Sequence, residues 1–275
     1  MSFLRKFARR TRPVAAIAGY ENQSFAGERE TLERLAELVG LQAGFVVDIA
    51  ASDGVSQSST IGLFASSGWR GLAVEMNPDK FSKLAQTYAA FELASLARTR
   101  ITPSNVACVL EAFEVPRNFS VLNLDIDSYD LRVLEACLKA GYKPSVVTME
   151  VNEKVPAGVF FTVEYDAEHF WQGDHFYGCS VDAASEIAKP YGYILWKVQY
   201  NNAFFVDSSV CTPGMTDLPA GIAWKTGYRD ASDRRELFSY NSDVEHWLEL
   251  EPEAAVASIR DFYSDYEGKY SIRVT

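Results

Sequence analysis

Two apolar stretches of the chain each carry a carboxylate close to their end, which is a pattern that can do chemistry. Residues 45–50 are apolar except for Asp48, and residues 71–75 end in Glu75. In a parallel α/β sheet the carboxyl ends of the strands face the ligand crevice. An acid at the second strand end can accept two hydrogen bonds from a ribose diol. The spacing therefore predicts a nucleoside cofactor site. The turn residues that we expect to approach the cofactor are Ala50, Ser52, Asp53 and Gly54.

The turn after the first predicted strand indicates which nucleoside this is. A dinucleotide site needs a Gly-x-Gly-x-x-Gly turn so that a pyrophosphate can lie against bare backbone. Here Ala50 and Ser52 stand where such glycines would be, and Asp48 and Asp53 add two negative charges. Carboxylates repel a pyrophosphate but attract an ammonium and a sulfonium group. The residues favour S-adenosylmethionine, and the alternative is a plain strand–turn–helix that binds no ligand.

A second set of carboxylates follows two later predicted strands. Asp125 and Asp127 lie on the same side of an extended segment, and Glu150 ends the next strand. Oxygen ligands from adjacent strand ends suit a hard cation such as Mg²⁺ or Mn²⁺, which can lower the pKa of a bound hydroxyl. We expect these three residues to be metal ligands. The alternative is that they cap the following helices or bind loop amides.

The segment 151–178 is rich in aromatic residues and is too long for a routine connection, so we expect it to be functional. It contains His175, and histidine is the side chain best matched to proton transfer near neutral pH. His175 is therefore a candidate general base, with Asp127 as a second candidate. The alternative is that His175 has only a structural role and packs among aromatic rings.

Composition excludes some classes of partner. The net charge of −11 argues against nucleic acid, which binds proteins through lysine and arginine. The four cysteines have no metal-ligand spacing, which indicates a reduced, cytoplasmic protein. No apolar run is long enough for a membrane span. Residues 1–12 carry five basic side chains and no acid, so they form either a peripheral contact with the inner face of a membrane or a helix packed on the domain or on a second copy in a homo-oligomer.

The elements that must position these residues alternate as in a wound α/β domain. We predict N-terminal basic and amphipathic helices in 1–39, a cofactor-binding domain over 40–207 with an insertion at 151–178, and a C-terminal extension over 208–275 packed on the same domain. The predicted strands are 45–50, 71–75, 98–102, 119–125, 145–150, 192–199 and 203–207, the last of them antiparallel because Asn201-Asn202 marks a hairpin turn. The predicted helices are 28–39, 57–67, 77–88, 129–140, 180–189 and 243–264, and 208–242 is predicted to be loop.

Four of these motifs, taken in order, resemble a known family. The segments 48–60 and 68–75, followed by 124–130 and 148–152, are similar to the cofactor region and later strand-end motifs of FkbM-like methyltransferases. The resemblance covers residues 40–207. It implies a Rossmann-like class I methyltransferase fold, an α/β arrangement with a mostly parallel sheet and an antiparallel last strand. It also implies S-adenosylmethionine as cofactor and O-methylation of a hydroxyl on a sugar, a glycan or a glycosylated natural product.

The resemblance also implies roles for single residues. Glu75 would bind the ribose, and Asp48 and Asp53 would organise the methionine side of the site. The remaining cofactor contacts would come from Ala50, Ser52, Gly54, Ser58, Ser59, Met76, Asn105 and Asp125, and related sugar methyltransferases that use Mg²⁺ give weight to the cluster of Asp125, Asp127 and Glu150. The chain departs from the family pattern at Ala50, where glycine is frequent, and at Ser52, where asparagine is usual.

Three other functions fit parts of the sequence. A metal-dependent glycosyltransferase would use Asp125-Ile126-Asp127 for a nucleotide-sugar diphosphate, but it leaves Asp48 and Glu75 unexplained. A non-catalytic module would bind S-adenosylmethionine without turnover, or would bind no cofactor. A dinucleotide oxidoreductase fits least, because the glycine pattern is absent.

Overall fold

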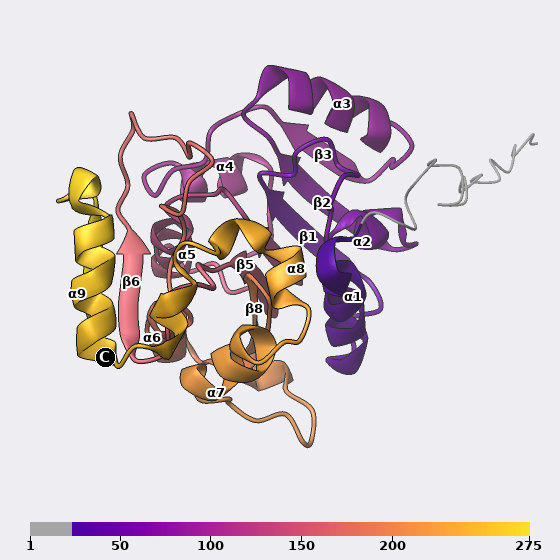
Figure 1. Cartoon of the computed structure of the whole chain (residues 1–275). Coiled ribbons are helices and arrows are strands. Elements are labelled where there is room, and N and C mark those ends of the chain that lie inside the picture. The colour runs from indigo at the N-terminus through magenta and orange to yellow at the C-terminus, as the bar shows by residue number, and fades with distance from the viewer. Residues whose placement is uncertain (1–23) are drawn as a thin grey trace, which may run out of the picture.

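The computed structural model describes residues 24–275 and is built around a seven-stranded sheet in the order β3-β2-β1-β4-β5-β8-β7 (Figure 1). The strands are β1 (Gly44–Ile49), β2 (Trp69–Val74), β3 (Ala94–Ala97), β4 (Val121–Leu124), β5 (Val146–Glu150), β7 (Tyr193–Gln199) and β8 (Asn202–Asp207). The order reverses between β1 and β4, which neighbour each other in the sheet. In a sheet of this kind the ligand crevice lies outside the carboxyl ends of the strands at that reversal.

The direction of the strands confirms the predicted mostly parallel sheet with an antiparallel last strand. β1 pairs in parallel with β2 and β4, and β4 pairs in parallel with β5. β8 is antiparallel to both β5 and β7. The hairpin between β7 and β8 turns at Tyr200, whose φ of 52° lies in the left-handed region that tight turns use. The α/β, Rossmann-like fold class is therefore shown.

Helices cover both faces of the sheet, as the alternation of side chains along β1 requires. Val46 packs toward α1, α2 and α3, whereas Phe45, Val47 and Ile49 pack toward α4, α5 and α6. The helices are α1 (Glu28–Leu38), α2 (Ile61–Ala65), α3 (Pro78–Tyr88), α4 (Val106–Ala112), α5 (Asp130–Lys139) and α6 (Val181–Ala188). Burial on both faces explains why β1, β4 and β5 read as nearly continuous apolar runs.

Two predicted elements of this domain are placed wrongly. The strand predicted at 98–102 is β3 at Ala94–Ala97, because the β-branched residues that follow it form a turn in which the Thr102 amide donates to Asn105 Oδ1 at 2.7 Å. The helix predicted at 57–67 is only α2, since residues 50–59 form a series of turns with Gln57 at a φ of 57°. Each error puts more loop at the carboxyl edge than we expected.

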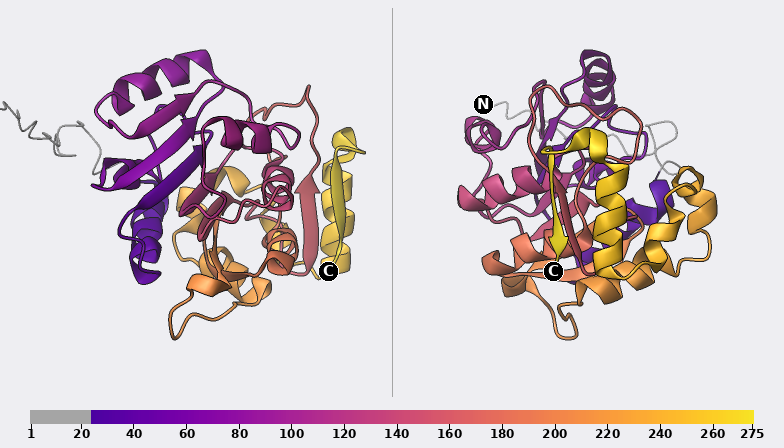
Figure 2. Two further views of the ribbon diagram at one scale, coloured as in Figure 1. Left: turned by 180° about the vertical axis from the view of Figure 1, so that it is seen from behind. Right: turned by 60° about the vertical axis from the view of Figure 1, so that its left-hand side comes forward.

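The insertion and the C-terminal extension form a second, two-stranded sheet that we did not predict. β6 (Val159–Val163) lies within the insertion and pairs antiparallel with β9 (Tyr270–Val274) near the end of the chain. The helix α9 (Pro252–Phe262) packs beside this pair (Figure 2). Val159, Phe161, Trp247 and Ile259 belong to its buried core. The extension thus ends against the insertion.

The extension is more helical than predicted. The segment 208–242, predicted to be loop, contains α7 (Ala220–Trp224), a π-turn at Lys225–Arg229 and α8 (Arg234–Leu237). The predicted helix 243–264 is instead a 3₁₀ segment at Glu245–Glu249 followed by α9. Pro252 explains the break, because proline lacks the amide that would continue a helix but fits its first turn.

The predicted basic helix at residues 1–12 lies outside the described residues. Within 24–275, every helix is too short or too polar to cross a bilayer.

Candidate functional site

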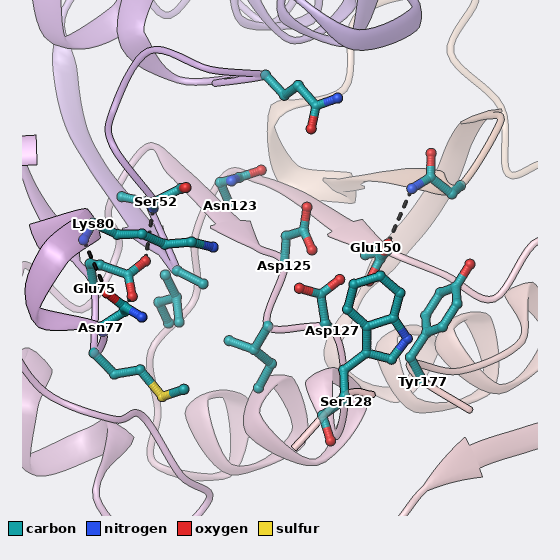
Figure 3. A pocket seen from close by; sticks show the side chains of 18 of the residues that line it. Ser52, Glu75, Asn77, Lys80, Asn123, Asp125, Asp127, Ser128, Glu150 and Tyr177 are labelled. Carbon is teal, nitrogen blue, oxygen red and sulfur yellow. Dashed lines mark hydrogen bonds between the residues drawn. The ribbon is translucent and has the colours of Figure 1, made fainter. Parts of the chain in front are cut away.

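A cavity of about 780 Å³ opens at the carboxyl edge of the sheet, where the strand order reverses. In Figure 3, Glu75 and Ser52 lie on one side, Asp125 and Asp127 in the middle, and Glu150 with Tyr177 on the other side. The predicted residues that line it are Asp48, Ala50, Ser52, Ser58, Ser59, Glu75, Met76, Asp125, Asp127, Glu150 and His175. The fold therefore gathers residues from all the strand-end motifs around one space.

The loop after β1 forms one wall with its backbone. Ala50 and Ser52 have positive φ angles of 68° and 52°, and Gly54 has 77°. Left-handed conformations favour glycine and cost other residues about 1–2 kcal/mol. Ala50 is therefore an alanine in a strained conformation.

Glu75 holds this wall in place. The side chain is 5% exposed, and its oxygens accept from the Ser52 amide at 3.0 Å and the Asn77 amide at 2.6 Å. Each carboxylate oxygen has a second acceptor position. Glu75 thus fixes the loop and keeps acceptor capacity toward the cavity, which is the arrangement needed to bind a diol.

Asp48 is occupied by its own neighbours. It is 2% exposed, and its two oxygens accept from the Thr60 hydroxyl at 2.6 Å and from Asn123 Nδ2 at 2.8 Å. Burial raises the pKa of Asp48, and the hydrogen bonds from Thr60 and Asn123 oppose that shift. These two hydrogen bonds link β1 to β4 and to the residue before α2, and so fix the floor of the cavity.

Three predicted cofactor residues do not line the cavity. Asp53 accepts from the Val55 and Ser56 amides and closes its own turn, and Gly54 faces Leu84 and Tyr88 of α3. Asn105 binds Thr102 and the Arg100 carbonyl at the start of α4. Asn105 was predicted to lie just after the third strand. Because β3 ends earlier than predicted, Thr99, Arg100 and Ile101 follow the strand end and line the cavity instead.

The three predicted metal ligands are close together. Asp125, Asp127 and Glu150 each offer an oxygen, and these oxygens lie within 4.8 Å of one another. Asp127 has a φ of 56°, a left-handed conformation that aspartate tolerates. Burial raises the pKa of Asp125 and of Glu150 well above the usual range, with mutual repulsion adding to it, and burial also raises the pKa of Asp127.

Glu150 is the clearest sign that this cluster is incomplete by itself. It is 6% exposed, and its Oε1 accepts from Asn201 Nδ2 at 3.2 Å. Its Oε2 is buried and receives no hydrogen bond from a donor group among the described residues, with the Asp125 carboxyl as its polar neighbour. A buried polar atom left unpaired costs about 1–3 kcal/mol. A cation beside Oε2 would remove that cost.

Asp130, which sequence reasoning missed, shapes the strand end that carries Asp125 and Asp127. It is fully buried, and its oxygens accept from the Ile126 amide at 2.8 Å and the Ser128 amide at 3.1 Å. Burial raises its pKa to about 7. No clear signal in the sequence marked this role, because capping aspartates usually accept from amides inside the helix, whereas Asp130 accepts from amides that precede it.

The insertion and the extension provide the wall opposite the cofactor loop. His175 lines the cavity, and its Nε2 lies 3.0 Å from Asp243 Oδ1, whereas its Nδ1 is buried without a hydrogen-bond partner among the described residues. Burial lowers the pKa of His175, with Lys154 as a further cause. A neutral imidazole beside a carboxylate can accept a proton.

The aromatic residues of the insertion divide into two groups. Trp171 is 44% exposed and lines the cavity with Tyr177, their rings 6.3 Å apart in an edge-on arrangement. Phe176 is instead fully buried and stacks on Tyr266, with the ring centroids 3.9 Å apart. Only the first group faces the cavity.

Sequence reasoning also missed cavity residues from outside the sheet. Glu28 comes from the start of α1, Lys80 from α3, and Tyr240 from the extension. Nothing in a local pattern marks them, since each reaches the cavity only through packing of distant segments. Phe25 and Phe238, for example, meet edge-on at 5.7 Å and join the N-terminal entry to the extension.

No protein-family model matches this sequence, and no curated protein matches it either. Several solved structures are similar to the chain. An S-adenosylmethionine-dependent methyltransferase from Aquifex aeolicus is 10% identical over 66% of this chain and 98% of its own, with a TM-score of 0.39. A second, from Clostridium acetobutylicum, is 10% identical over 68% and 93%, with a TM-score of 0.42. An O-methyltransferase family protein from Burkholderia thailandensis is 11% identical over 66% and 56%, with a TM-score of 0.38.

Proposed function

We propose that this protein is an S-adenosylmethionine-dependent O-methyltransferase that acts on a sugar or glycan hydroxyl with the help of a divalent cation. The observation that carries this proposal is one cavity that runs from the diol acceptor Glu75 to the carboxylate cluster of Asp125, Asp127 and Glu150. It is large enough for a cofactor and part of an acceptor, because small-molecule sites measure about 300–1,000 Å³.

The charge of the cavity supports S-adenosylmethionine over a dinucleotide. Carboxylates line it from end to end, and the cationic side chains among the described lining residues are Lys80 and Arg100. Arg100 is engaged by the Ala167 carbonyl and lies over the Phe170 ring at 4.4 Å. Such a lining suits a cofactor that carries a sulfonium and an ammonium group and opposes a pyrophosphate.

The carboxylate cluster fits a divalent cation such as Mg²⁺ or Mn²⁺. Its donors are all oxygens, which hard cations prefer, and Oε2 of Glu150 receives no hydrogen bond from a donor group among the described residues. A cation held there would polarise an acceptor hydroxyl and lower its pKa. The three residues would hold the ion and, through it, the oxygen that is to be methylated.

The aromatic side chains at the rim fit a sugar acceptor. Trp171 is 44% exposed and Tyr240 is 54% exposed, whereas Tyr177, which also lines the cavity, is buried. Exposed aromatic rings offer flat apolar faces with polar tips, which can cover the C–H face of a sugar ring while its hydroxyls reach the carboxylates.

S-adenosylmethionine supplies an electrophilic methyl group, so the residues of this chain act by positioning and by moving one proton. Glu75 and the loop at 50–52 fix the cofactor end, and Trp171 with the cluster orients the acceptor. His175 and Asp127 are the two bases that we propose for the hydroxyl proton. The lowered pKa keeps His175 neutral, and Asp243 would stabilise the imidazolium that forms.

A methyl-transfer assay with a panel of sugar acceptors tests this function. We expect transfer that EDTA abolishes and added Mg²⁺ or Mn²⁺ restores, and loss of about a hundredfold or more in kcat for Glu150→Gln. Glu37→Gln, on the outer surface of α1, is the matched control and should keep full activity. Transfer that is indifferent to EDTA would remove the metal from the proposal, and transfer to a nitrogen acceptor in place of hydroxyls would remove the acceptor class.

A further inference from the structure

The first residue of α1 carries a carboxylate into the cavity. Glu28 is 6% exposed and lines the cavity although it lies before the first strand of the sheet. Its Oε1 accepts from Asn202 Nδ2 at 2.6 Å, and its Oε2 accepts from the Ser59 hydroxyl at 3.3 Å. A carboxylate has about four acceptor positions, so about two remain for a ligand.

Two hydrogen bonds of Gln199 fix the position of the start of α1, and with it the position of Glu28. Gln199 Nε2 donates to the Ala26 carbonyl at 2.5 Å, and Thr31 donates to Gln199 Oε1 at 2.5 Å. These bonds attach the start of α1 to the end of β7, next to the hairpin that carries Asn202. Glu28 is therefore held at one position above the sheet edge.

No cationic side chain among residues 24–275 forms an ion pair with Glu28, although it is buried and lies in an acidic cavity. Its burial raises its pKa to about 8. A buried carboxylate is stable in its charged form only with a cation or a full set of donors. The site has room for a positive group that belongs to a ligand.

The other carboxylates of the cavity are already used. Asp48 is paired with Thr60 and Asn123, and Asp174 accepts from the Phe176 amide and the Tyr266 hydroxyl. Glu75 is placed for a diol, and the cluster of Asp125, Asp127 and Glu150 is placed for a metal ion. Glu28 also accepts two hydrogen bonds, but the bond from Ser59 is 3.3 Å long, whereas both bonds to Asp48 are 2.8 Å or shorter, so the Glu28 oxygen beside Ser59 is the more weakly held.

We infer that Glu28 binds the α-ammonium group of the methionine part of S-adenosylmethionine, beside Ser59. The inference rests on the proposed function, which places the ribose at Glu75. It assigns the two ends of the cofactor to two separate parts of the chain, the end of β2 and the start of α1. The start of α1 then belongs to the cofactor site.

Calorimetric titration of the full chain with two cofactor fragments tests this role. S-adenosylhomocysteine keeps the amino acid, whereas 5′-methylthioadenosine keeps only the nucleoside and the sulfur. For Glu28→Gln we expect affinity for S-adenosylhomocysteine to fall about ten- to hundredfold, the range of a hydrogen bond to a charged group, with affinity for 5′-methylthioadenosine unchanged. Glutamine can accept from Asn202 through its oxygen and donate to the Ser59 hydroxyl through its amide nitrogen, so the variant should fold.

The control and the contrary outcomes separate this inference from the proposed function. Glu37→Gln, on the same helix but exposed, should bind both compounds like the unaltered protein. Equal loss of both compounds in Glu28→Gln would mean a structural role and overturn the inference, as would no loss at all. If the unaltered protein binds neither compound, the proposed cofactor site itself is wrong and the inference falls with it.

Discussion

At the scale of single residues, Ala50 links the sequence most directly to a local conformation. Its φ of 68° is one that glycine adopts freely, and β-branched residues adopt it with difficulty. This chain therefore forms the turn with an alanine in a conformation that glycine would adopt without strain.

Substitutions at Ala50 should show that conformation in stability. Ala50→Gly should change the free energy of unfolding by less than about 1 kcal/mol, because relief of the left-handed strain offsets the added freedom of the unfolded chain. Ala50→Val should destabilise by about 2 kcal/mol. Urea unfolding measures both, and Ala85→Gly within α3 is the control, with an expected loss of about 1 kcal/mol. An equal loss for both glycine variants would contradict the strained turn.

The residues that the sequence identified are those whose neighbours along the chain reveal them. Glu75, Asp125 and Glu150 were predicted because an apolar run ends at each of them, and parallel strands share one carboxyl edge. Asp53 and Asn105 were misplaced, because a side chain in a turn can face the ligand or its own backbone with the same sequence. Glu28 could not be predicted, since its contact with Asn202 spans most of the chain.

At the scale of elements, the central sheet was predictable and the segments that cover the cavity were not. The alternation of helix and strand signals fixes β1, β2, β4 and β5 to within two residues. The pairing of β6 with β9 joins the insertion to the last residues of the chain, and no local pattern marks such a contact. The position of the C-terminal extension therefore depends on packing between segments that are far apart in the sequence.

A buried polar network anchors that extension over the cavity. Asn241 donates to Glu153 Oε1 at 2.7 Å and to the Tyr228 hydroxyl at 3.0 Å, and Tyr177 donates to Glu153 Oε2 at 2.7 Å. Lys154 Nζ donates to the Tyr177 hydroxyl at 2.7 Å and lies 4.0 Å from its ring centroid. The network holds Tyr177 of the insertion beside Tyr240 of the extension, and both residues line the cavity.

Removal of one partner should loosen the extension. Asn241→Leu removes the bonds to Glu153 and Tyr228 and leaves Oε1 of buried Glu153 with the longer bond from Lys154 Nζ at 3.4 Å, so we expect a loss of about 2–3 kcal/mol in the free energy of unfolding. Hydrogen exchange should increase mainly within residues 208–275. Ser239→Ala, at a neighbouring exposed position, should be neutral within about 0.5 kcal/mol. A neutral Asn241→Leu would show that the network does not hold the extension.

At the scale of the whole molecule, the acidic cavity makes the stability depend on pH. Burial raises the pKa of Glu28 to about 8, of Asp130 to about 7 and of Asp182 to about 6. In the unfolded chain these carboxyls ionise near pH 4–4.5. Between those limits the folded protein binds more protons than the unfolded chain, so stability falls as pH rises. Carboxyls with lowered pKa values, such as Glu164, make stability depend on pH only at lower pH than this.

The ligand-free protein should therefore unfold at a lower temperature at pH 8 than at pH 5.5. Added Mg²⁺ should raise the unfolding temperature at pH 8 more than at pH 5.5, because it binds the ionised cluster. Thermal unfolding followed by circular dichroism in matched buffers measures this. Glu150→Gln should reduce both the pH dependence and the response to Mg²⁺. A higher unfolding temperature at pH 8 without ligand would contradict the buried carboxylates.

The central claim is that one cavity holds a nucleoside at Glu75 and a cation at the carboxylate cluster. Calorimetric titration with S-adenosylhomocysteine tests it most directly, for the unaltered protein and for Glu75→Ala, with Mg²⁺ and with EDTA. We predict binding by the unaltered protein and a loss of about a hundredfold or more in Glu75→Ala, because the ribose loses a charged acceptor. Glu37→Gln should bind normally. Absence of binding in a folded sample, or full binding by Glu75→Ala, would contradict the account.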